Sequence, residues 1–120
     1  MKFVNRIAII ITPRQPMHQW LTTHEFDDIP SLSELSSESS CYLVDEPAQE
    51  QPLDELLSQL LQRHGQNIWQ SELGVWDEFG DNTPALKDQE QFNLWFDARI
   101  SGLTFDLAKQ PLMVANVNDM

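Results

Sequence analysis

The chain is poor in basic residues, and this shortage excludes several classes of partner. Its 120 residues contain 7 Lys and Arg against 19 Asp and Glu, so the formal net charge is −12. Residues 15–62 carry ten carboxylates and not one Lys or Arg. A surface of this charge repels phosphate backbones and anionic membranes, and it attracts basic proteins and cations. We therefore expect no nucleic-acid partner and no membrane partner.

Cysteine, glycine and long apolar runs are also scarce. A lone Cys41 excludes a disulfide framework and a thiolate metal cage, and it fits a reducing cytoplasm. The apolar run at 7–11 is too short for a signal peptide, and no segment approaches the ~18 apolar residues of a membrane span. No glycine-rich phosphate loop and no Gly-x-Ser-x-Gly elbow occurs. We expect a cytoplasmic protein without a cofactor.

What the sequence does contain is enough apolar material for one core. Apolar residues make up 41% of the chain, including six Phe and four Trp. We expect a single domain over residues 1–110, with an acidic, serine-rich linker at 25–40 inside it and a tail at 111–120. Periodicity predicts strands at 3–12, 41–44, 92–100 and 103–107, and helices at 16–24, 53–64 and 68–76. Ser31 and Glu34 have the spacing of a capping box, which predicts one helical turn within the linker.

The C-terminal strands can be arranged in two ways. Apolar residues alternate from Phe92 to Ile100, and the alternation changes phase at Ser101 and Gly102. A two-residue hairpin turn explains this change, and so does a bulge in one long strand. A helix over 91–100 competes with both, because the aromatic residues there also fit a helical stripe. We prefer strands.

The order of elements predicts an α/β fold, bordering on α+β. We expect a small two-layer domain with a mixed sheet of about four strands and helices packed on one face. The opening strand-helix-strand unit would form a right-handed parallel crossover if both strands share the sheet. The C-terminus would add the hairpin or the bulged long strand.

A parallel crossover would place a polar site at the ends of the first two strands. Arg14, Asp45 and Glu46 would meet there, with His18 one turn into the first helix. Arg14 would bind a carboxylate or phosphate, and His18 would move a proton. The alternative is a structural ion pair between Arg14 and Asp45 or Glu46.

The hairpin arrangement makes a second suggestion, because it sets Asp97 directly opposite Asp106. Like charges across a ladder need a compensating cation or a basic group, and carboxylate pairs also serve acid/base chemistry. An arginine-bridged surface pair is the commoner case. The loop at 77–82 offers oxygen ligands but fails the calcium-loop pattern, so we expect a solvated turn and no metal site.

Two tryptophans are candidates for an interface. Trp76 precedes an acidic loop, and Trp95 would point off the apolar face of its strand. An exposed tryptophan among acids is a frequent interface feature, since aromatic residues anchor while charges steer encounter. The alternative is that a helix covers both side chains.

These observations favour a small acidic protein-binding module, adaptor-like or inhibitor-like, that docks on a basic surface of a partner protein. One alternative is a small enzyme or ligand-binding domain with its site at the ends of the first two strands, although catalytic motifs are absent. Another is a nucleic-acid mimic, which is less favoured because most acids fall in loops. The tail at 111–120 would fray or add an edge strand to a neighbouring subunit, so homo-oligomer formation stays open.

Overall fold

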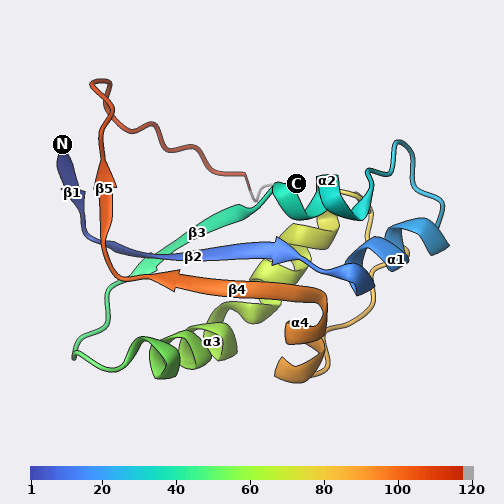
Figure 1. The fold of residues 1–120 in the computed structure, drawn as a ribbon, viewed down its shortest axis with the longest axis horizontal. Helices are drawn as coiled ribbons and strands as arrows, with labels where there is room; N and C mark the ends of the chain where they lie inside the picture. The colour runs from blue at the N-terminus through green and yellow to red at the C-terminus, as the bar shows by residue number, and fades with distance from the viewer. Residues whose placement is uncertain (118–120) are drawn as a thin grey trace.

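The computed structural model describes residues 1–117 and contains a three-stranded antiparallel sheet. The central strand β2 (Arg6–Pro13) lies between β3 (Ser40–Asp45) and β4 (Phe96–Ser101). Figure 1 shows α3 (Leu53–Gly74) running behind these strands. The small two-layer α/β class is thus confirmed. None of the helices in the described part combines the length and apolarity that a membrane-spanning helix needs.

The expected mixed sheet and parallel crossover are wrong, because β2 and β3 pair antiparallel. The chain leaves β2 at Pro13 and forms α1 (Gln15–Thr23) and then α2 (Leu32–Ser37). The Ser36 hydroxyl donates a 3.2 Å hydrogen bond to the Pro13 carbonyl, so α2 lies at the same end of β2. If β3 ran parallel to β2, the linker would have to return the chain to the end of the sheet where β2 begins. β3 therefore begins beside the end of β2 and runs back along it.

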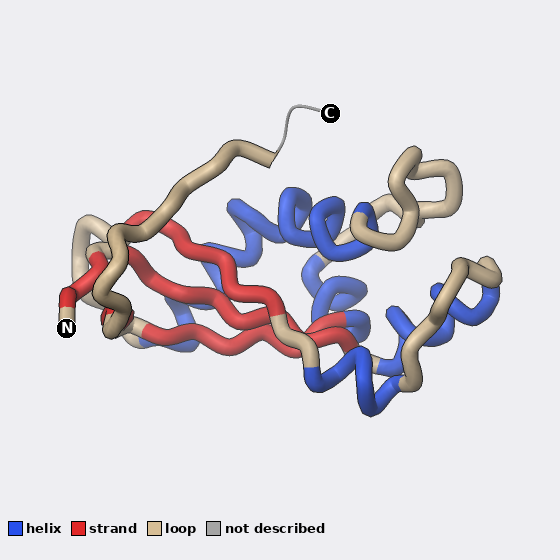
Figure 2. The backbone as a smooth tube through the Cα atoms, turned by 90° about the horizontal axis from the view of Figure 1, so that it is seen from above, coloured by secondary structure: helices blue, strands red, loops and turns tan. Residues whose placement is uncertain are grey.

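A second, two-stranded sheet is formed by β1 (Lys2–Val4) and β5 (Thr104–Asp106). β4 does not pair with β5, so the hairpin interpretation is wrong and the long, interrupted strand is the better description. The ladder is broken where residues 5–7 lie opposite residues 102–103, which places the extra residue on the N-terminal strand. Figure 2 shows the two-stranded sheet at one end of the three-stranded sheet and most of the helices toward the other end.

The leucine helix is longer than the sequence pattern predicts. We expected it to stop at Gly65, but α3 spans 22 residues and absorbs the weaker helix that was expected after it. A glycine in a helix interior costs about 1 kcal/mol. Burial of Ile68, Trp69 and Leu73 on the same face outweighs that cost.

The segment before β4 is helical, contrary to our preference for strand. Asp88 caps α4 (Gln89–Trp95), and its carboxylate accepts a 2.8 Å hydrogen bond from the Gln91 amide. Phe92 and Phe96 are both fully buried, one from the helix and one from the first position of β4. The core is thus built from one face of the sheet and the facing helices, with aromatic residues concentrated near α4.

Candidate functional site

The polar group expected at the ends of the first two strands does not assemble. Asp45 is the register partner of Arg6, at the start of β2, whereas Arg14 follows the end of that strand. At about 3.3 Å per residue, the eight steps from Arg6 to Arg14 span roughly 26 Å. Asp45 and Glu46 therefore lie at the opposite end of the sheet from Arg14.

Arg14 instead pairs with Asp97, so the expected pairing with Asp45 or Glu46 is wrong. Arg14 Nη2 lies 3.1 Å from Asp97 Oδ1, and Arg99 Nε lies 3.2 Å from the other carboxylate oxygen. The Arg14 amide also donates to the Trp95 carbonyl at 2.8 Å, which fixes the start of α1 against the end of α4. The two guanidinium groups compensate the negative charge of this one carboxylate, and the three side chains form an ion-pair cluster at the surface.

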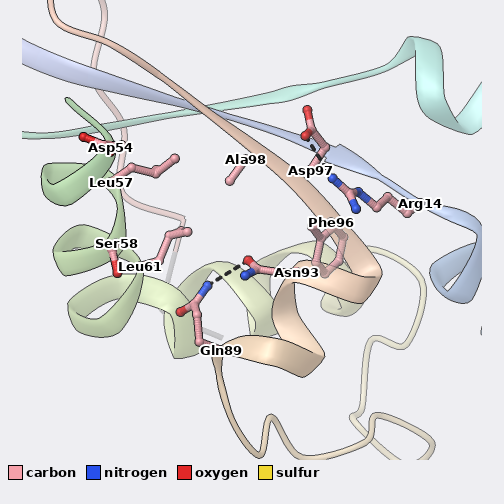
Figure 3. A pocket seen from close by; sticks show the side chains of 10 residues that line it. All are labelled: Arg14, Asp54, Leu57, Ser58, Leu61, Gln89, Asn93, Phe96, Asp97 and Ala98. Carbon is pink, nitrogen blue, oxygen red and sulfur yellow. Dashed lines mark hydrogen bonds and ion pairs between the residues drawn. The ribbon is translucent and has the colours of Figure 1, made fainter.

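A cavity of about 360 Å³ opens beside this pair, as Figure 3 shows. Its polar side chains come from β4, α3 and α4 in addition to Arg14; they are Asp54, Ser58, Gln89, Asn93 and Asp97. His18 does not line this cavity. Its Nε2 lies 3.0 Å from the Pro30 carbonyl oxygen, which can only accept, so this ring nitrogen donates and ties α1 to the linker.

The carboxylate pair expected across a hairpin does not exist. Asp97 is the register partner of Thr12, and Asp106 is the register partner of Lys2. The two carboxylates belong to different sheets, so the acid/base use of that pair has no geometric basis. Among residues 1–117, no group of three or more His, Cys, Asp and Glu side chains is arranged to hold a metal ion.

The two candidate interface tryptophans are partly buried against the core. The ring centroid of Trp95 lies 4.8 Å from that of Trp69 and 6.1 Å from that of Trp20. Trp95 ends a helix, so the strand geometry that would have pointed it outward does not apply. Trp76 packs against the same core from the segment after α3.

The most exposed phenylalanine within residues 1–117 is Phe79, which the sequence patterns did not single out. Its side chain is 83% exposed, in the loop that connects α3 to α4. Glu78 and Asp81 flank it and are also exposed. An aromatic residue in a loop rich in acids was visible in the sequence, but exposure is not encoded by any local periodicity.

A buried carboxylate holds this loop in place. Asp77 is only 6% exposed, and its Oδ2 accepts hydrogen bonds from the Thr83 hydroxyl at 2.6 Å and the Asn82 amide at 2.8 Å. The Thr83 hydrogen bond, supported by backbone amides, holds the pKa of the Asp77 carboxyl below its ordinary value. Gly80, at φ +72°, closes the turn by donating to the Asp77 carbonyl at 3.0 Å.

Two tryptophans also fasten the loop to the core. The Trp20 indole donates to the Asn82 carbonyl at 3.0 Å, and the Trp69 indole donates to the Pro84 carbonyl at 2.8 Å. Both rings are buried. The backbone that follows Phe79 is therefore attached to α1 and α3, and the loop is held by the folded core.

A cavity of about 470 Å³ lies between this loop and α3. Phe79, Glu78 and Asp77 line it from the loop, and Gln66 and Gln70 line it from the helix. Carboxylates and amide oxygens accept hydrogen bonds from cationic side chains. We call the loop at 77–83 together with this cavity the Phe79 site.

The acids of the 15–62 stretch do not form a regular array. Glu34, Asp45, Asp54 and Glu55 lie in helices or strands, and the other six of the ten lie outside them. Their spacing is thus set largely by loops. We find no protein-family model, curated protein or solved structure that matches this chain significantly.

Proposed function

We propose that the protein is a small acidic binding module whose Phe79 site docks on a basic surface of a partner protein. The observation that carries the proposal is the exposed ring of Phe79 on a loop held by the buried Asp77 carboxylate. Exposed aromatic residues dominate binding energy in interfaces when they enter a pocket on the partner. A loop already held in place loses little conformational entropy on binding.

The charge around Phe79 defines the partner's chemistry. Glu78 and Asp81 flank the ring, and the chain as a whole carries −12. This field steers a basic protein toward the site and raises the rate of encounter at low salt. The partner surface we expect is an apolar pocket for Phe79 rimmed by Lys or Arg, one of which reaches the 470 Å³ cavity.

A retention experiment with matched variants tests the proposal. Wild type, Phe79→Ala and Phe3→Ala are immobilised and exposed to lysate of the source organism at low salt. Phe3 is the matched control because its ring is also exposed but lies on β1. We expect a basic protein that wild type and Phe3→Ala retain, that Phe79→Ala loses, and that high salt releases.

Variants of the charged residues separate electrostatic steering of the partner from anchoring by the Phe79 ring. With the retained protein purified, Glu78→Gln and Asp81→Asn should mainly lower the association rate and its salt dependence. Phe79→Ala should mainly raise the dissociation rate. Equal retention by all variants, or a retained protein without a basic surface, would rule out the Phe79 site.

A further inference from the structure

The outer edge of β3 is unpaired within the described residues. β3 has β2 on one side only, because the strand order is β3-β2-β4. Edge strands are usually protected by lysine, proline or a bulge. The six residues of β3, from Ser40 to Asp45, include neither lysine nor proline, and their pairing with β2 is continuous from Ser40 to Asp45.

A groove of about 390 Å³ runs between this edge and α3. Tyr42, Leu43 and Val44 form its strand side, and His64, Asn67 and Ile68 form its helix side. The Tyr42 hydroxyl donates to Glu72 Oε2 at 2.5 Å and lies 3.1 Å from the Ser71 hydroxyl, which ties the edge to α3. An unpaired edge beside a helix is the geometry used by proteins that bind an extended peptide as an added strand.

The segment at 111–117 has the properties of such a strand. Leu112, Met113, Val114 and Val117 are 68–85% exposed and contact no partner strand. In an extended conformation Met113, Ala115 and Val117 share one face, which is wholly apolar. Seven extended residues span roughly 23 Å, enough to cover a six-residue strand of roughly 20 Å. Figure 1 shows the chain after β5 running toward α2, apart from the three-stranded sheet.

Charge explains why this segment suits the groove. Asp45 lines the neighbouring surface together with Glu46, and Glu72 lies at the Tyr42 hydroxyl. A body of net charge −12 repels a second body of the same charge. Residues 107–117 contain no acid and one base, Lys109, so this segment adds no like-charge repulsion of its own at an acidic groove.

We propose that residues 111–117 of a second copy add to the outer edge of β3 as an antiparallel strand, with Met113 and Val117 in the groove against α3. Antiparallel addition sets Lys109 of one copy beside Asp45 and Glu46 of the other. Each copy offers both a segment and an edge, so a reciprocal exchange closes as a two-fold dimer.

Sedimentation of the full chain over a wide range of concentration tests the proposal. Wild type should form a dimer that dissociates on dilution. The double variant Met113→Asp/Val117→Asp should raise the dimer dissociation constant by at least about tenfold, because each exchanged segment would bury two unpaired carboxylates. Leu43→Lys, which places a charge on the exposed edge, should do the same. Leu107→Asp, outside the added strand, should leave the dimer unchanged.

Hydrogen exchange identifies the occupant of the edge. Amides of 112–117 and of β3 should gain protection as the dimer forms. A chain that stays monomeric with these amides unprotected overturns the proposal. A monomer whose segment is protected at every concentration also overturns it, because the segment then folds back on its own edge. A dimer that survives both the double variant and Leu43→Lys shows that another surface mediates it.

Discussion

The hydroxyl of Thr83 donates a 2.6 Å hydrogen bond to the buried carboxylate of Asp77, six residues earlier in the chain. This contact closes the loop that carries Phe79. Hydrogen bonds of this kind stabilise the ionised carboxylate, which is why the pKa of Asp77 lies below its ordinary value. The order of the loop therefore depends on an ionised group and on pH.

Acid should loosen the Phe79 loop. Because the folded-state pKa of Asp77 is lowered, its stabilising contribution is complete above the ordinary carboxyl value of about 3.9 and is lost as pH falls through the folded value. We expect tryptophan fluorescence to change in this range, since Trp20 and Trp69 both donate to the loop backbone. Measurement of emission against pH follows the transition.

Two variants isolate this contribution from that of the other carboxylates. Asp77→Asn retains an acceptor oxygen but has no charge to titrate, so the part of the fluorescence change due to the loop should disappear. Asp81→Asn, at an exposed neighbouring position, should behave like wild type. If Asp77→Asn titrates in the same way as wild type, Asp77 does not control the loop.

The two glycines Gly65 and Gly80 should respond to alanine in opposite directions. Gly65 is inside α3, and an added Cβ would meet only Leu86 Cδ2 at 3.9 Å, an ordinary contact. Gly65→Ala should raise the free energy of unfolding by about 0.5–1 kcal/mol. Gly80 has φ +72°, so Gly80→Ala should lower it by about 1 kcal/mol. Urea denaturation measures both, and a destabilised Gly65→Ala would show that α3 has no room for the methyl group.

The pair between Arg14 and Asp97 should contribute little to stability. The two side chains are 51% and 34% exposed, so solvent and salt screen their attraction. We expect Arg14→Gln to lower the free energy of unfolding by less than about 1 kcal/mol, and the loss to shrink in high salt. Arg99→Gln, at a more exposed position, serves as the comparison. A salt-independent loss of several kcal/mol would instead indicate a structural role for the Arg14–Asp97 pair drawn in Figure 3.

Two local signals in the sequence predicted local structure correctly. Ser31 and Glu34 form the capping box at the start of α2, with both reciprocal hydrogen bonds present. The leucine stripe that begins at Leu53 is the N-terminal half of α3. These features depend on contacts between residues within about one helical turn. The local sequence pattern is therefore sufficient to predict them.

The pairing of strands that are far apart in the sequence could not be predicted from local patterns. In the hairpin interpretation Ile100 faces Leu103 and Ala98 faces Phe105, an apolar register as consistent as the true one. The actual partners of β4 lie in β2, where Ile100 pairs with Ile9. Phe96 belongs both to the helical stripe with Phe92 and to the alternation with Ala98, so periodicity alone could not locate the change from α4 to β4.

The prediction of the candidate site depended most on which distant segments of the chain pair with one another. Arg14, Asp45 and Glu46 would come together only if β2 and β3 paired in parallel, and these strands pair antiparallel. The order of the loop around Phe79 depends on indoles from α1 and α3, which no spacing within the loop reveals. Burial of Asp77 was equally hidden, because its hydrogen-bond partners Asn82 and Thr83 are ordinary turn residues.

The pairing of β2 with β4 also sets the timing of folding. Each residue from Ala8 to Pro13 pairs with a residue between 83 and 93 positions later in the chain. Contacts of such long sequence separation are slow to form, because a large loop must close before they contribute. During synthesis, at least 83 further residues must therefore follow each paired residue of the central strand before its partner in β4 is made. Until then one side of an isoleucine-rich strand is available to chaperones or to other nascent chains.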